Sequence, residues 1–292
     1  MSGHFIAPDA ALANLAEPHL KLGVPIHSGY QALSEVARLV GRNRIFDAVA
    51  ELLGTVDMPY EDQCSIDYYF DLVRVLRDLN GEYDRVVEVG VYMGGASGVI
   101  AGCAEQFNFD IDLVDISAAN LQFAHERIRR AFPDVAERVR LFHGDLPAYV
   151  RKVMMNEQTG RSILHHDGAH DFNQVVTDLT ALSFVRDQIH SVIAQDTHLR
   201  GNLDHMNFVD LALNAVFGPD FNYMPIGKVY GRDNREMTSP NRFQGNYFLP
   251  GVSEGMVLPL HANRFHYPHP DMTFEDLFGS GVEGQGGARQ AA

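Results

Sequence analysis

The sequence predicts an α/β fold with a doubly wound, mostly parallel sheet of seven strands. Between residues 85 and 195, short apolar runs alternate with segments whose apolar residues recur every three to four positions. This alternation is typical of a parallel sheet with helical crossovers. The predicted strands are 85–91, 111–115, 139–143, 162–166 and 191–195, with helices at 95–106, 117–131 and 170–184. After a helix at 203–217, closely spaced strands at 221–230 and 245–260 are expected to close the sheet as an antiparallel pair.

The first 80 residues precede this alternation and are predicted to form a helical extension or lid. Apolar residues at helical spacing cover 31–53, where Gly41 interrupts them, and again 65–79. Two short helices are therefore expected in the first of these stretches. The main domain is then 81–278, followed by a low-complexity tail, 279–292, that is predicted to be disordered. The polar segment 231–244 is long for a turn and is predicted to be a functional loop.

Composition restricts the partners. The formal net charge of −15 argues against nucleic acid, because phosphate binding needs lysine and arginine. The first 20 residues hold one lysine and no long apolar run, so neither a signal peptide nor a membrane span is expected. Two cysteines, Cys64 and Cys103, provide no disulfide framework. We therefore expect a cytoplasmic protein whose partner is a small molecule.

The stretch RVVEVGVYMGGASG, residues 85–98, reads as a buried strand, a glycine turn and a helix. The next apolar strand ends on Asp115, 20 residues after Gly95. This order is how α/β sheets hold a nucleoside, since glycines admit the ligand to the backbone and the acid can accept ribose hydroxyls. Three residues separate Gly90 from Gly94, which excludes the G-x-G-x-x-G fingerprint, and no Gly-Lys-Ser/Thr follows as in a P-loop. A tight turn without a ligand is the alternative.

The pattern E-x-G-x-x-x-G, with the acid inside the strand, resembles class I S-adenosylmethionine-dependent methyltransferases. The resemblance implies that the methionine end of the cofactor lies at the glycine turn and that the acid after the second strand binds the ribose. It also places Asp145, after the third strand, at the adenine amino group, although an ordinary turn residue is equally compatible with Asp145. The predicted cofactor contacts are Glu88, Gly90, Tyr92, Gly94, Asp115, Ile116, Asp145 and Asp167.

Acids and histidines follow the fourth and fifth predicted strands. Asp167 and His170 lie in the turn D-G-A-H after the fourth strand, and Asp196 and His198 follow the fifth. The carboxyl ends of adjacent parallel strands meet at one edge of a sheet. The carboxylates of Asp167 and Asp196 are therefore expected to lie close together and to repel each other unless a cation lies between them. Mg²⁺ is the simplest such cation.

The turn D-G-x-H, followed by a strand and D-T, is similar to the macrocin-type sugar O-methyltransferases and to the cephalosporin hydroxylase-like group. This resemblance covers roughly residues 84–200 and implies that Asp167 and Asp196 are metal ligands. This chain departs at Gln195, where the resemblance leads us to expect an acid. An amide carbonyl can still coordinate a metal but brings no charge, so Gln195 is the third, weaker candidate ligand.

Together these patterns predict an S-adenosylmethionine-dependent O-methyltransferase that acts on a natural-product or sugar hydroxyl in secondary metabolism, with assistance from Mg²⁺. The catalytic candidates are Asp167, His170 and His198, because neutral imidazole is a suitable general base near neutral pH. Exposed N-terminal helices favour a homodimer. Two alternatives stay open. One is a hydroxylase-like Fe(II) enzyme using Asp167, His170 and His198. The other is a nucleoside-binding module without turnover, for which Gln195 is the best support.

Overall fold

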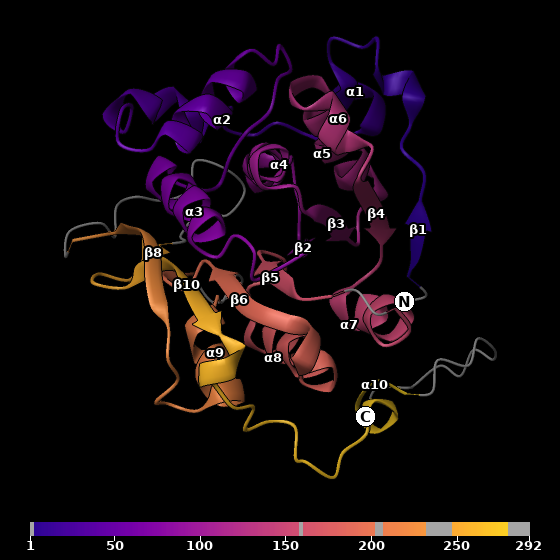
Figure 1. Cartoon of the computed structure of the whole chain (residues 1–292), viewed down its shortest axis with the longest axis vertical. Coiled ribbons are helices and arrows are strands. Elements are labelled where there is room, and N and C mark those ends of the chain that lie inside the picture. Colours follow the sequence, from indigo (N-terminus) through magenta and orange to yellow (C-terminus); the bar gives the residue numbers. More distant parts are fainter. Residues whose placement is uncertain (1–2, 158–159, 202–206, 232–246, 280–292) are drawn as a thin grey trace.

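In the computed structural model of the chain, which describes residues 3–157, 160–201, 207–231 and 247–279, eight strands form one large sheet. They are β1 (His4–Ile6), β2 (Arg85–Val89), β3 (Asp110–Asp115), β4 (Val139–His143), β5 (Ser162–His166), β6 (Ile189–Gln195), β8 (Met224–Val229) and β10 (Ser253–Pro259). Their order is β1-β4-β3-β2-β5-β6-β10-β8 (Figure 1). Strands β4, β3, β2, β5 and β6 run parallel to one another, β10 pairs antiparallel with β6, and β8 pairs antiparallel with β10. The predicted doubly wound, mostly parallel sheet is confirmed.

The sheet carries one strand more than the sequence pattern predicts. Strand β1 pairs antiparallel with β4, with His4 opposite His143. Three residues are too few to show an alternation, so this strand exists because it pairs with β4 and not because of local propensity. A separate small sheet joins β7 (Leu199–Arg200) to β9 (Tyr247–Phe248).

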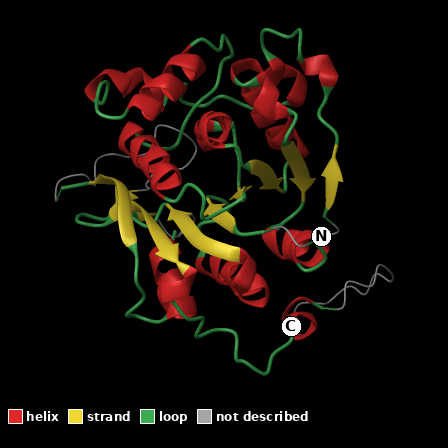
Figure 2. Cartoon of the chain, viewed as in Figure 1, coloured by secondary structure: helices red, strands yellow, loops and turns green. Residues whose placement is uncertain are grey.

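Helices cover both faces of the sheet. They are α1 (Pro18–Leu22), α2 (Arg44–Gly54), α3 (Ile66–Asp78), α4 (Gly95–Phe107), α5 (Ala118–Ala131), α6 (Pro133–Ala136), α7 (Leu146–Tyr149), α8 (Phe172–Leu182), α9 (Val209–Phe217) and α10 (Phe274–Phe278). Helices α2 to α6 pack on one face, and α7 to α9 pack on the other (Figures 1 and 2). The strand residues alternate between the two layers: Val86 belongs to the first hydrophobic cluster and Val87 to the second.

The N-terminal segment shares the core of the sheet. The stretch 31–53 contains a 3-10 helix (Ala32–Arg38) and α2, as the interruption at Gly41 predicts. Tyr68 and Leu72 of α3 are fully buried in the same cluster as Val86. Apart from Gly231, the predicted functional loop lies outside the described residues, as does the tail from residue 280 on. Among the described residues, the longest apolar helices all fall short of a membrane span.

Candidate active site at the carboxyl edge

The strand order reverses between β2 and β5, and open α/β sheets bind ligands at such a switch point. Gly90 follows β2 and has a φ of +82°. A Cβ atom on Gly90 would lie 2.2 Å from the carbonyl oxygen of Asp167, which follows β5. The backbone N–H of Asp167 also donates to the carbonyl of Val89 at 2.8 Å. The glycine turn and the D-G-A-H turn are therefore in direct backbone contact.

Asp115, at the end of β3, holds the glycine turn from the other side. Its Oδ2 accepts the N–H of Val91 at 2.9 Å, and its Oδ1 accepts the N–H of Ser117 at 2.7 Å. Burial raises the pKa of Asp115, and these backbone N–H groups oppose the rise. A carboxylate offers about four acceptor positions. The N–H of Tyr92 and the side chain of Asn120 also act on this carboxylate, so Asp115 ties the glycine turn to the start of α5.

Glu88 lies beneath the turn, between the sheet and the helices α3 and α4. It is 1% exposed, and its Oε1 is 4.0 Å from Nδ1 of His165, whose Nε2 pairs with the Tyr68 hydroxyl at 2.9 Å. Burial raises the pKa of Glu88 well above its ordinary value and lowers that of His165 to about 4, so His165 is neutral near pH 7. Among the described residues, Glu88 Oε2 has no hydrogen-bond partner.

An apolar side chain and polar groups lie together at the ends of β3 and β4. Ile116 directly follows Asp115 and is 62% exposed. Its carbonyl is bonded to His143 Nε2 at 3.0 Å. Asp145 caps α7, where its Oδ1 accepts the N–H of Ala148 at 2.9 Å. An exposed apolar surface beside polar groups can hold one face of a planar base.

Asp167, His170 and Asp196 form a cluster next to the glycine turn. His170 Nε2 is 3.2 Å from Asp196 Oδ2 and 3.6 Å from Asp167 Oδ1. One ligand atom from each residue lies within 4.8 Å of the others. Asp196 has a φ of 58°, a left-handed conformation that aspartate tolerates better than most residues. One nitrogen and two carboxylate oxygens at this spacing can hold a divalent cation.

The two carboxylates control the protonation of His170. Burial disfavours its charged form, but Asp196 and Asp167 outweigh that effect and raise the pKa of His170 to about 9. Burial raises the pKa of Asp196, His170 opposes the rise, and Asp167 adds to it. In this arrangement His170 holds a proton at neutral pH, whereas the predicted general base would have to be neutral.

His198 does not join the cluster. It is 2% exposed and stacks on Phe248, with ring centroids 4.4 Å apart, and Tyr230 lies on the same group of rings. Burial, with a smaller contribution from Arg200, lowers the pKa of His198 to about 3. The iron hypothesis needs His198 beside Asp167 and His170. In the structure, Asp196 and not His198 lies beside these two residues.

Gln195 is 1% exposed and donates from Nε2 to Cys64 Sγ at 2.9 Å. Its Oε1 has no hydrogen-bond partner among the described residues, so that oxygen keeps its coordinating capacity. Cys64 itself was not singled out for the site. The sequence carries no signal for this contact, because Cys64 lies in a loop 131 positions before Gln195.

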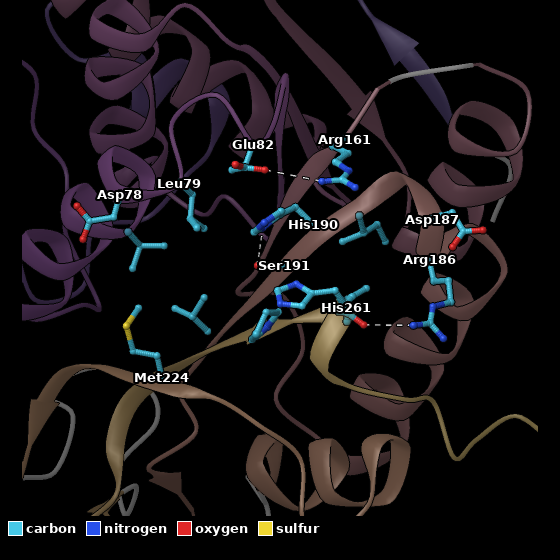
Figure 3. Close-up of a pocket in the computed structure, with 15 residues that line it drawn as sticks. Asp78, Leu79, Glu82, Arg161, Arg186, Asp187, His190, Ser191, Met224 and His261 are labelled. Carbon is cyan, nitrogen blue, oxygen red and sulfur yellow. Dashed lines mark hydrogen bonds and ion pairs between the residues drawn. The ribbon is translucent and has the colours of Figure 1, made fainter.

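A cleft of about 820 Å³ lies at the opposite edge of the sheet (Figure 3). His190 and Ser191 at the start of β6, His261 after β10 and the arginines Arg161 and Arg186 are among the residues that line it. None of the predicted site residues lines this cleft. Strand order and glycine turn both indicate the carboxyl edge instead.

No model of a known protein family matches this chain, and no curated protein matches it. The chain is similar to several solved structures. A candidate O-methyltransferase from Klebsiella pneumoniae is 14% identical over 80% of this chain and 98% of its own, with a TM-score of 0.46. An O-methyltransferase from Bacillus cereus in complex with S-adenosylhomocysteine is 12% identical over 80% of this chain and 100% of its own, with a TM-score of 0.46. A cofactor-bound protein from MTB is 12% identical over 77% of this chain and 94% of its own, also with a TM-score of 0.46. At these values the likeness carries no argument about activity, which is proposed below from the chain's own residues.

Proposed function

We propose that this chain is an S-adenosylmethionine-dependent O-methyltransferase that acts on a small-molecule hydroxyl. The observation that carries the proposal is the backbone contact between Gly90 and Asp167 at the switch point. This contact places the glycine turn, which suits a nucleoside, beside the Asp167–His170–Asp196 cluster, which suits a cation and a hydroxyl. Methyl transfer needs this adjacency, because the protein's share in it is mainly to bring acceptor and donor together in line.

The residues around the turn fit the cofactor. Asp115 is a carboxylate at the end of β3, where it can accept ribose hydroxyls, and Ile116 offers an exposed apolar face to adenine. The unpartnered Oε2 of Glu88 is buried acceptor capacity that a nearby ammonium group would stabilise. When bound, S-adenosylmethionine supplies a methyl group on a positively charged sulfonium. Asp115 and Asp167 at the edge give this cation a favourable environment.

Asp167, His170 and Asp196 would hold a divalent cation such as Mg²⁺ or Mn²⁺. A cation between these groups displaces the proton on His170, so His170 serves as a ligand in this proposal. A metal at this place lowers the pKa of a coordinated hydroxyl and fixes its direction. The half-buried Asp167 also lies where it can accept the hydroxyl's hydrogen bond beside the glycine turn.

Calorimetric titration with S-adenosylmethionine and S-adenosylhomocysteine tests the first step, with Asp115→Asn as the site variant. Asp110→Asn is the matched control, because Asp110 begins the same strand at the far edge and its side chain is 54% exposed. We expect wild type and the control to bind and Asp115→Asn to bind at least tenfold more weakly. Absence of binding by the wild type at millimolar cofactor contradicts the proposal.

A nucleoside-binding module without turnover is the second candidate, favoured by the uncharged Gln195 beside the cluster. A broad panel of phenols, sugars and other alcohols, incubated with enzyme, cofactor and Mg²⁺ or Mn²⁺, separates the two. Methylation that Asp196→Asn abolishes supports the enzyme. Tight cofactor binding with every acceptor left unmethylated supports the module.

We also propose that the protein acts as a homodimer through its N-terminal helical segment. The exposed apolar side chains of Val40 and Leu52 support this. Light scattering on the purified protein measures the mass directly, and a monomer at micromolar concentration contradicts it.

A further inference from the structure

Glu61 joins the N-terminal segment to the glycine turn. This carboxylate is fully buried, and its Oε2 accepts the backbone N–H groups of His27 and Ser28 at 2.9 and 2.5 Å. The same oxygen accepts the Gly29 N–H at 3.2 Å and the Ser28 hydroxyl at 2.9 Å. The other oxygen, Oε1, accepts the hydroxyl of Tyr92. One side chain thus fixes three consecutive residues, 27–29, to the turn.

Tyr92 is the residue of the turn whose position needs such support. Its φ is 43°, a left-handed conformation that costs a tyrosine free energy which glycine would not lose. Gly90 and Gly94 in the same turn have φ values of 82° and 72°, so every second residue of the turn is left-handed. The bond to Glu61 selects one position for the Tyr92 ring, and with it the path of the turn.

The next residue, Asp62, makes a second connection between the same two segments. Its Oδ2 accepts the N–H of Ala32 at 2.8 Å, and its own N–H donates to the Tyr30 carbonyl at 2.7 Å. Its Oδ1 accepts the Tyr69 hydroxyl at 2.6 Å. A Cβ on Gly95 would lie 2.1 Å from this Oδ1, so the carboxylate touches the start of α4 directly. Residues 27–32 are therefore held against the turn at both of its ends.

The charge of Glu61 agrees with this role. Burial works to raise its pKa, but the donors Tyr92 and Ser28 outweigh burial and lower the pKa of Glu61 below its ordinary value. Glu61 is therefore ionised at neutral pH, and bonds to an ionised acceptor are about twice as strong as neutral ones.

We propose that Glu61 is a positioning residue of the cofactor site: through the Tyr92 hydroxyl it couples the order of residues 27–29 to ligand binding at the glycine turn. Residues 27–29 then form a wall of the site at the methionine end. This proposal rests on the proposed function, because the ligand it refers to is S-adenosylmethionine or S-adenosylhomocysteine. It gives the N-terminal extension a specific task that its sequence does not reveal.

Tyr92→Phe is the sharpest variant, since it removes one oxygen and leaves the ring and the backbone in place. Glu61→Gln is the second, because it removes the charge and keeps the shape. Tyr30→Phe is the matched control: its hydroxyl lies on the same segment but donates to Glu35, away from the turn, at 2.9 Å. Two quantities are measured for each: the Kd for S-adenosylhomocysteine by calorimetry, and hydrogen exchange of the peptide covering residues 24–32 with and without that ligand.

For Tyr92→Phe and Glu61→Gln we expect the Kd to rise about tenfold, equivalent to about 1.4 kcal/mol, and exchange of 24–32 to rise in the free protein. In the wild type the ligand should slow that exchange, and in Tyr92→Phe it should slow it less. Tyr30→Phe should bind within twofold of the wild type. Faster exchange with an unchanged Kd would show a purely structural link and overturn the proposal, as would unchanged exchange. A wild type that binds no ligand is recognised before any variant is made and refutes the proposed function itself.

Discussion

The carbonyl oxygen of Asp167 lies where the side chain of Gly90 would begin, 2.2 Å from the ideal Cβ position. Two loops that are 77 residues apart in the sequence thus meet at the point where the strand order reverses. A left-handed φ and this close approach both require glycine at position 90. The contact sets how near a ligand in the glycine turn comes to the acidic cluster.

Gly90→Ala should therefore destabilise the protein in two ways. The left-handed φ alone costs an alanine about 1–2 kcal/mol, and the clash with Asp167 adds to it, so a total loss of about 3 kcal/mol or more is expected. Gly81→Ala is the matched control, since Gly81 has a φ of +90° with open space around its missing Cβ. Urea unfolding measures both. Equal losses for the two variants would mean that Asp167 moves away freely and that the contact does not constrain the site.

Divalent cations should stabilise the protein through the Asp167–His170–Asp196 cluster. A cation at 100 times its Kd adds about 2.7 kcal/mol to the free energy of unfolding. Thermal unfolding with Mn²⁺ or Mg²⁺, against the chelator-treated protein, should show a higher Tm, and Asp196→Asn should abolish the difference. Asp271→Asn tests specificity, because Asp271 also pairs with a histidine but its side chain is 91% exposed. A Tm increase that survives Asp196→Asn places the cation elsewhere.

Ile116→Ala should weaken nucleoside binding and leave stability nearly unchanged. The side chain is 62% exposed, so its truncation costs the folded protein at most about 0.5 kcal/mol. Covering it with adenine buries apolar surface at about 25 cal/mol per Å², and several-fold weaker binding of S-adenosylhomocysteine is expected. Val40→Ala, at the same exposure but on the N-terminal segment, should bind normally. If Ile116→Ala binds S-adenosylhomocysteine as tightly as the wild type, adenine does not lie against Ile116 at the end of β3.

Glu126 should make stability depend on pH. Its carboxylate is 3% exposed and accepts from Arg129 and Arg130 on α5, at 2.8 and 2.7 Å. Burial works to raise the pKa of Glu126, but the two arginines outweigh it and lower the pKa below its ordinary value. This stabilisation is complete above the unfolded-state pKa of about 4.3 and is lost as the pH falls through the lower folded-state pKa.

Glu126→Gln should accordingly lose about 1–3 kcal/mol at pH 7, and the gap to the wild type should narrow as the pH falls below about 4. Urea unfolding of both proteins from pH 7 to pH 3 measures this difference in stability. Glu35→Gln removes a carboxylate that also pairs with arginine but is 40% exposed, and its loss should stay under about 0.5 kcal/mol. A gap for Glu126→Gln that is independent of pH would show that shape, and not charge, is what the helix needs.

The repeating part of the fold was predictable because each parallel strand has a buried apolar centre. Strands β4 and β5 begin and end where the sequence pattern places them. Strand β1 was not predictable, since His4–Ile6 is a strand only through its pairing with β4. Strand β10 is shorter than the predicted strand, as Pro250 and Gly251 form a turn before it.

For the site, topology brought Asp167, His170 and Asp196 together as their strand ends predict. The environment of each residue was not predictable. The stacking of His198 on Phe248 depends on the pairing of β7 with β9, in which Leu199 lies opposite Phe248. The charge on His170 depends on distances of a few ångströms to two carboxylates. The role of Glu61 depends on donors from a segment more than 30 residues away.

Strand β8 ends the sheet on one side, yet its edge is poorly suited to recruit another strand. The N–H groups of Gly227 and Lys228 are taken by the carboxylates of Asp71 and Glu254, and Pro225 has no N–H to offer. At the other border only the three residues of β1 lie open. Blunted borders of this kind protect a β protein from adding foreign strands and from aggregating edge to edge. The two borders of the described sheet therefore offer a second copy of this chain little backbone to pair with, which agrees with the proposed association through side chains of the N-terminal helices.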